Sequence, residues 1–190
     1  MTTEEIFAKI STHMAKGLRI HSQIATLYGF LNLCGYQKCH EYHFYEESCN
    51  YRCLQNFFLA HCGKMLHEDT IEEPDIIPSN WYKFSKSDVD ANNKRSAIKD
   101  IIKKWVDWEK ETKSLLESSY KQLYDLGEID CALKISYFIK DVSHELATAQ
   151  EKQINLESMG YDIVYIIDQQ PELYKHYCKK IKEIHEDDEE

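Results

Sequence analysis

Three glutamates, Glu47, Glu109 and Glu145, stand at positions where a helical hydrophobic pattern calls for an apolar residue. A carboxylate buried without compensation is costly, so each of these side chains needs a hydrogen-bonding partner, a proton or a metal ion. One such residue would carry little information, but one in each of three apolar stripes points to a shared site. The chemistry that this set favours is metal binding. The alternative is a buried carboxyl pair that shares a proton or reaches a lysine or tyrosine.

Hydrophobic periodicity predicts four long helices that would position these glutamates. Apolar residues recur three and four apart in segments that run from about Thr3 to Cys34, Gln37 to Leu66, Asn93 to Leu126 and Cys131 to Met159. Glycines follow three of these segments and are predicted to cap their ends: Gly35, Gly127 and Gly160. Asp130 is predicted to cap the start of the fourth helix.

The segment from His67 to Asn93 is rich in turn-forming residues and predicts a long crossover between two helical hairpins. Its aromatic residues Trp81, Tyr82 and Phe84 are predicted to pack against the helices. Pro171 is predicted to open a short fifth helix, which an acidic tail follows. The sequence therefore predicts an all-α antiparallel four-helix bundle over residues 1–160, with the short helix and the tail in residues 161–190.

The hairpins also predict which side chains lie at the same depth. Residues equidistant from a tight turn are level with each other, so counting from Gly127 pairs Glu109 with Glu145. Counting from Gly35 pairs Glu47 with Gln23. If the two hairpins dock in the usual way, these four side chains converge in the centre of the bundle.

Nearby histidines extend the predicted metal site. Asp141 and His144 have carboxylate-x-x-histidine spacing, and His144 adjoins Glu145, so His144 is a candidate supporting ligand. His21 flanks the proposed centre and is a further candidate. The polar segment from Cys39 to Glu46 contains two more histidines but lacks the Cys-x-x-Cys pairs of a zinc site, which favours ordinary surface chemistry.

Composition disfavours several other classes of function. The formal net charge of −10 argues against nucleic acid as a partner, because phosphate binding needs clustered lysine and arginine. No segment has the length of apolar sequence that a membrane span needs, and the acidic N-terminus is unlike a signal peptide. The seven cysteines are odd in number and have no disulfide-like spacing, which favours a reducing cytoplasm.

Several local features resemble the ferritin-like proteins: Ala25-Thr26-Leu27-Tyr28, Glu46-Glu47, Pro74-Asp75, Trp81 and Trp108-Glu109-Lys110. The resemblance covers Met1 to Gly160, and the helix after Pro171 resembles the terminal helix of ferritins. It implies a ferritin-like bundle and a homo-oligomer. It also implies an iron centre with Glu47, Glu109 and Glu145 as ligands, supported by Gln23 and His144. The implied activity is ferroxidase-type oxidation of Fe(II) by dioxygen or peroxide, for iron storage or detoxification.

The sequence departs from the family pattern at two positions of the implied centre. Gln23 stands where the first helix usually supplies a glutamate, and Asn50 stands where the second helix usually supplies a histidine. These departures indicate a degenerate diiron centre. They leave open a non-catalytic ferritin-fold scaffold or assembly subunit that has lost its metal. A third alternative is a diiron oxygenase-like or rubrerythrin-like enzyme, against which the missing Glu-x-x-His of the second helix weighs.

Overall fold

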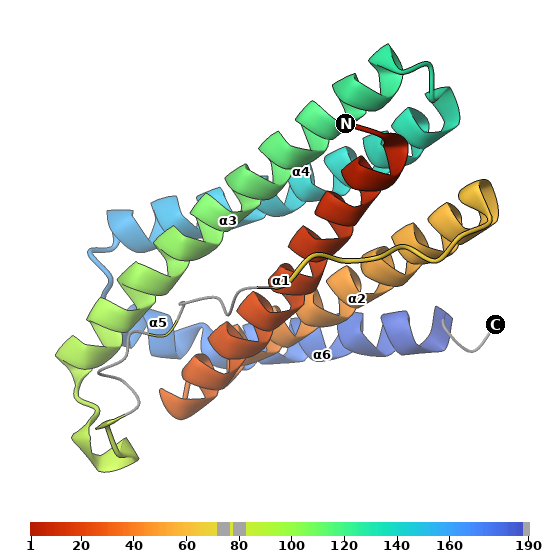
Figure 1. The fold of residues 1–190 in the computed structure, drawn as a ribbon. Coiled ribbons are helices and arrows are strands. Elements are labelled where there is room, and N and C mark those ends of the chain that lie inside the picture. Colours follow the sequence, from red (N-terminus) through yellow and green to blue (C-terminus); the bar gives the residue numbers. More distant parts are fainter. Residues whose placement is uncertain (72–76, 78–82, 188–190) are drawn as a thin grey trace. The chain divides into compact units, whose positions relative to one another are not determined.

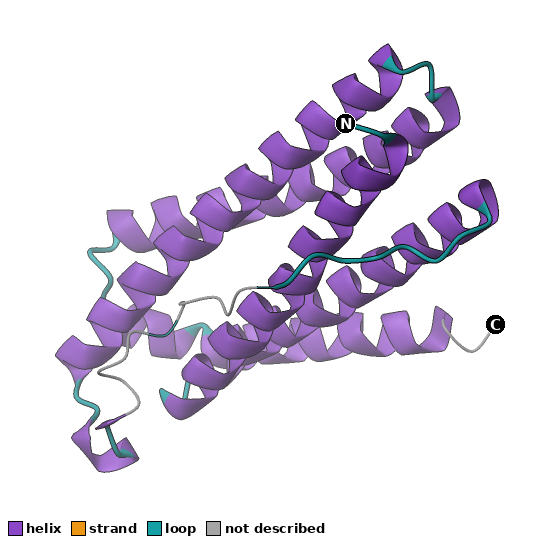
Figure 2. Cartoon of the chain, viewed as in Figure 1, coloured by secondary structure: helices purple, strands orange, loops and turns teal. Residues whose placement is uncertain are grey.

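The computed structural model describes residues 1–71, 77 and 83–187, and every regular element within them is a helix (Figures 1 and 2). The elements are α1 (Thr3–Phe30), α2 (Cys34–Cys62), a short 3-10 helix η2 (Lys86–Asp88), α3 (Ala91–Asp125), α4 (Ile129–Ser158), α5 (Ile163–Asp168) and α6 (Gln170–Asp187). The predicted all-α class and the long connection between the second and third long helices are confirmed. Within the described ranges, no helix is both long enough and apolar enough to cross a membrane.

The chain divides into two compact units that do not follow chain order. Unit 1 contains Met1–Ala15, Asn50–Glu72 and Ile102–Asn155, and unit 2 contains Lys16–Cys49, Glu73–Ile101 and Leu156–Glu190. The long helices α1, α2, α3 and α4 each contribute residues to both units. The last three residues of the acidic tail lie outside the described residues, as do Pro74, Asp75, Trp81 and Tyr82 of the crossover.

Four helices supply the core of unit 1. Its apolar cluster takes side chains from α1, α2, α3 and α4: Ile6, Phe7, Ile10, Met14, Leu54, Phe58, Leu116, Leu123, Cys131, Ala132, Ile135, Phe138 and Val142. The rings of Phe7 and Phe58, both members of this cluster, lie 5.3 Å apart. Because four amphipathic helices bury their apolar faces against one another, this unit has the four-helix packing that the periodicity predicted.

The turn between α3 and α4 is centred on Gly127, as predicted. Gly127 adopts φ +80°, which glycine reaches without the steric cost of a side chain. The Glu128 N–H then donates to the Leu123 carbonyl oxygen at 3.0 Å, which closes the end of α3. The prediction for Asp130 is wrong. The first helical hydrogen bond of α4 runs from the Ala132 N–H to the Glu128 carbonyl, so Glu128 is the capping residue and Asp130 lies within the first turn.

The turn between α1 and α2 is centred on Asn32, and the prediction that Gly35 ends the first helix is wrong. Asn32 adopts φ +57°, a left-handed conformation that asparagine tolerates better than most residues. Gly35 lies in the first turn of α2, where the start of α6 approaches it closely. A Cβ at Gly35 would lie 2.6 Å from the Gln170 carbonyl oxygen. Gly35 is therefore required for a close helix contact.

Gln170 joins α6 to the start of α2 within unit 2. Its Oε1 accepts hydrogen bonds from the backbone N–H groups of Gly35, at 2.9 Å, and Tyr36, at 3.2 Å. These are among the N–H groups that a helix start leaves without a partner inside the helix. Further along, the rings of Tyr42 and Tyr177 lie 5.7 Å apart, so α6 covers one face of α2. The predicted helix near Pro171 is thus confirmed as α6, whereas α5 was not predicted.

The crossover is fastened to unit 1 at its beginning. Glu68 accepts hydrogen bonds from the Ser11 hydroxyl at 2.6 Å and from the Gln55 amide at 3.2 Å, and the Tyr51 hydroxyl also donates to it. The Asp69 N–H donates to the Thr12 hydroxyl at 3.0 Å. These contacts hold the first residues after α2 against α1 and α2.

Candidate metal centre

Two of the predicted ligands are buried carboxylates of unit 1. Glu109 on α3 is 1% exposed and Glu145 on α4 is 8% exposed, which confirms that both lie on the inner faces of their helices. The Trp105 indole N–H donates to Glu109 Oε1 at 2.9 Å and fixes the direction of that carboxylate. Since an indole is neutral, this hydrogen bond orients the charge of Glu109 without cancelling it. A cation near these carboxylates would offset the cost of burying them.

The confirmed turn at Gly127 preserves the predicted pairing of Glu109 with Glu145. Both residues remain equidistant from the centre of that turn. The convergence of these two side chains with Glu47 and Gln23 stays a prediction. Glu47 and Gln23 belong to unit 2.

Unit 2 contains three buried histidines, which form the histidine cluster: His21 on α1 and His40 and His43 on α2. They are 0%, 2% and 4% exposed, respectively. The centre of the His21 ring lies 5.3 Å from that of the His40 ring and 5.4 Å from that of the His43 ring. The expectation that Cys39 to Glu46 has surface character is therefore wrong for both α2 histidines. The pattern of one helix could not show that α1 and α6 cover this part of α2.

The contacts of His21 and His40 indicate which of their ring nitrogens carry protons. His21 Nδ1 and His40 Nδ1 lie 3.0 Å apart, so one ring donates and the other accepts. Glu47 Oε1 lies 3.7 Å from His21 Nε2, and its negative charge favours a proton on that nitrogen. We therefore assign His21 Nδ1 as the acceptor and the His40 Nδ1–H as the donor. With that assignment, the lone pair of the His40 ring is on Nε2.

Burial keeps His21 neutral. Desolvation lowers the pKa of His21 well below its ordinary value, and the neighbouring His43 lowers that pKa further. A neutral imidazole is the form that binds divalent metals. The Glu46 carboxylate lies 3.5 Å from His43 Nδ1 and also accepts a hydrogen bond from the Tyr42 hydroxyl at 2.9 Å. The histidine cluster and Glu46 together thus offer imidazole and carboxylate donors, which suit iron and zinc.

Gly17 makes room for the Glu47 carboxylate beside α1. A Cβ at Gly17 would lie 2.2 Å from Glu47 Oε2, well inside van der Waals contact. The predicted pairing of Glu47 with Gln23 is therefore wrong, because it was counted from Gly35. Counted from Asn32, the true centre of the turn, Gly17 is level with Glu47 and His21 is level with His43. The correct turn residue would thus have revealed part of the cluster from the sequence.

The remaining predicted ligands differ in exposure. Gln23 is half-buried on α1, and its Oε1 atom is buried without a hydrogen-bond partner among the residues that the structure describes. Such an oxygen can accept a hydrogen bond from a water molecule or contact a cation. His144 lies on the exposed side of α4, next to the buried Glu145. An exposed side chain is poorly placed to support ligands on the inner face of the same helix.

No protein-family model matches the sequence, and no curated protein matches it either. Solved structures do match the fold. An open-pore ferritin from the hyperthermophilic archaeon Archaeoglobus fulgidus aligns with a TM-score of 0.73 at 13% identity, over 90% of this chain and 95% of that chain. An engineered closed form of the A. fulgidus ferritin gives 0.74 at 13% identity, over 92% and 96%. A humanized archaeal ferritin gives 0.76 at 12% identity, over 92% and 97%. The chain therefore has a ferritin-like all-α fold.

Proposed function

We propose that this chain is a ferritin-like protein that binds iron through buried carboxylates. The observation that carries the proposal is the burial of Glu109 and Glu145 on the consecutive helices α3 and α4 of a ferritin-like fold. Ferrous and ferric ions prefer carboxylate and imidazole ligands, and a carboxylate pair needs a compensating charge when it is removed from water.

Each unit, considered by itself, contains residues that fit an iron ion. In unit 1 the carboxylates of Glu109 and Glu145 would hold it. In unit 2 the donors would be Glu47, His40 and His43, with Gln23 kept as a predicted supporting residue. His144 is exposed, so we leave it outside the proposed set of ligands.

The roles of the protein groups follow from their contacts. Trp105 holds the Glu109 carboxylate in one direction. Gly17 lets the Glu47 carboxylate reach His21, and burial keeps the His21 ring neutral, so that its Nδ1 accepts the hydrogen bond that orients the His40 ring. When bound, iron would supply the electrons for reduction of dioxygen or peroxide, which is the ferroxidase-type chemistry that we propose for storage or detoxification.

Anaerobic loading with Fe(II), desalting and elemental analysis test the proposal. The wild-type chain is expected to retain about one or two ions, as a mono- or diiron centre would. Glu109→Gln and Glu145→Gln each remove one anionic ligand and are expected to lower the affinity by about 10- to 100-fold. Glu111→Gln on α3 and Glu151→Gln on α4 change exposed glutamates of the same helices and serve as matched controls.

Two outcomes would contradict iron binding by these residues. One is a wild-type chain that keeps no iron after desalting. The other is equal retention by the Glu109→Gln variant and its Glu111→Gln control. Either result would favour the non-catalytic scaffold with the same fold, the alternative that Gln23 and Asn50 suggest. In a scaffold without metal, replacing a buried acid could raise the stability.

We further propose that the chain forms a homo-oligomer. The outer side of α4 exposes Leu133 and Tyr137, one helical turn apart, at 52% and 66%. Large exposed apolar side chains that lie together favour burial in an interface. Light scattering coupled to size-exclusion chromatography should give a multiple of the 22.5 kDa chain mass. Tyr137→Glu is expected to lower that mass, and a wild-type monomer would exclude the proposal.

The cysteines support the predicted cytoplasmic location, which we retain as a proposal. The described residues include all seven, and none of them forms a disulfide. Free thiols persist in reducing compartments, where glutathione and thioredoxin keep them reduced.

A further inference from the structure

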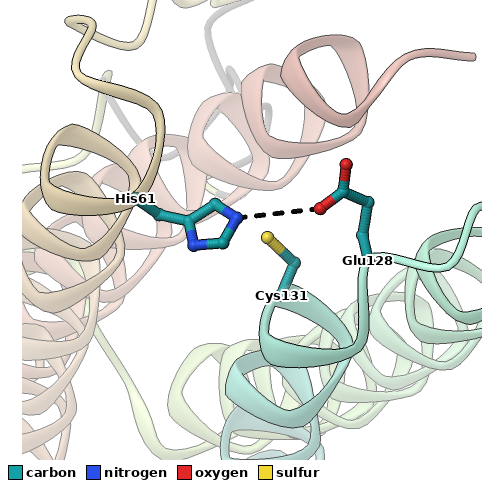
Figure 3. Close-up of side chains that lie close together, drawn as sticks. All are labelled: His61, Glu128 and Cys131. Atoms are coloured by element: carbon teal, nitrogen blue, oxygen red, sulfur yellow. Dashed lines mark ion pairs between the residues drawn. The ribbon is translucent and has the colours of Figure 1, made fainter.

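A second set of metal-ligating side chains lies in unit 1, where α2 ends and α4 begins (Figure 3). His61 belongs to the last turn of α2, Glu128 caps α4 and Cys131 lies in the first turn of α4. One nitrogen, one oxygen and one sulfur from these residues all lie within 4.8 Å of one another. His61 Nε2 and Glu128 Oε2 lie 3.7 Å apart. None of these residues takes part in the proposed iron chemistry.

The fold holds these three donors together through separate contacts. Glu128 and Cys131 are three positions apart at the start of one helix, so they lie on the same side of it. The Gly127 turn sets where α4 begins and thereby places both. The His61 ring stacks on Phe57 at 5.6 Å with an interplanar angle of 10°, which orients the imidazole. Cys131 is fully buried in the core cluster, which fixes its thiol.

The thiol chemistry at this place disfavours a reactive cysteine. Burial raises the pKa of the Cys131 thiol to about 11, and the Glu128 carboxylate adds to the rise. The pKa of the adjacent Cys62 thiol is also raised, mainly by burial and then by Glu128. Neutral thiols are weak nucleophiles and slow to oxidise, so a catalytic or redox-sensing role has little support. A bound metal ion would stabilise a thiolate that water does not reach.

We propose that His61, Glu128 and Cys131 bind Zn²⁺. Imidazole nitrogen, carboxylate oxygen and thiolate sulfur are the three donor types found in protein zinc sites, whereas thiolate is a poor match for a hard ion. Zn²⁺ to ligand distances imply donors about 3.3–3.8 Å apart in a tetrahedral site. The present separations, all within 4.8 Å, need to close by about 1.5 Å at most.

The side chains can move to that tetrahedral geometry by changing rotamer. His61 and Glu128 have side chains 33% and 41% exposed, so they can change rotamer without disturbing the core. Three protein ligands leave the fourth tetrahedral position to a water molecule. A zinc ion here would tie the end of α2 to the start of α4, and it would therefore stabilise unit 1.

Cobalt(II) substitution tests the site under reducing conditions, because only a thiolate ligand gives an intense sulfur-to-cobalt absorption band in the near ultraviolet. The wild-type chain should show this band, and Zn²⁺ should displace it. Cys131→Ser should abolish it, and His61→Gln and Glu128→Gln should weaken Co²⁺ binding by about 10-fold or more. Cys178→Ser and His176→Gln, in α6, are matched controls that should leave the band intact.

The variants distinguish the zinc site from both misfolding and the iron proposal. His61 and Glu128 are partly exposed, so their variants keep the core even if Cys131→Ser unfolds. Glu109→Gln should keep the cobalt band whatever its effect on iron. A wild-type chain without the band would overturn the proposal. So would a band that survives in a folded Cys131→Ser variant, or equal Co²⁺ affinity in His61→Gln and wild type.

Discussion

Gly17→Ala is expected to weaken iron binding by about 10- to 100-fold while leaving the chain as stable as wild type or more stable. The new Cβ would collide with the end of the Glu47 side chain, at 2.2 Å from Oε2. Because that end is flexible, the carboxylate can move away at little cost. Glycine inside a helix is less favourable than alanine by about 0.5–1 kcal/mol, so the helix itself gains. The measurements are iron retained after desalting and the urea midpoint.

A second glycine on α1 provides a matched control for this prediction. A Cβ at Gly29 would lie 2.9 Å from Gln37 Oε1, again the far end of a flexible side chain. Gly29→Ala should therefore raise stability to a similar extent without changing iron retention. Adding Gly17→Ala to a Glu47→Ala variant should cause no further loss of iron, since the displaced carboxylate is already absent. Undiminished iron in Gly17→Ala would show that Glu47 has no part in binding.

Gly35→Ala is expected to lower the free energy of unfolding by about 1–3 kcal/mol, the opposite sign to Gly17→Ala. Here the new Cβ would meet backbone, at 2.6 Å from the Gln170 carbonyl oxygen and 3.0 Å from the Gln170 Cα. Backbone cannot rotate away, so the start of α6 must shift from α2. That shift would also break the hydrogen bonds that Gln170 Oε1 accepts from the Gly35 and Tyr36 N–H groups. A buried N–H group left without a partner is costly in itself.

Urea unfolding and amide hydrogen exchange together test this second prediction. Gly35→Ala should lower the urea midpoint and accelerate exchange of the Tyr36 amide, which Gln170 protects in the wild type. Lys175→Ala, at an exposed position of α6, controls for substitution in that helix and should change neither. If Gly35→Ala proves as stable as Gly29→Ala, α6 does not begin against Gly35.

The sequence signals that proved correct are those that depend on residues close together in the chain. Apolar periodicity located the long helices, and Gly127 and Gly160 mark two helix ends, because a single helix face and a positive φ depend on local sequence. In the sequence, Gly35 resembled a glycine that ends a helix, but the structure requires a glycine there for another reason. Its lack of a side chain matters for the approach of Gln170, which lies far away in the chain.

The sequence by itself determined the all-α class, the long crossover and the burial of Glu109 and Glu145, since one apolar stripe is enough to reveal a polar residue within it. Only the tertiary structure decided that His40 and His43 are buried beside His21, that Gly17 accommodates Glu47, and that His61, Glu128 and Cys131 meet. These depend on which helix covers which face and on the register of each hairpin. Both are set by packing between segments distant in sequence, and no local pattern records them.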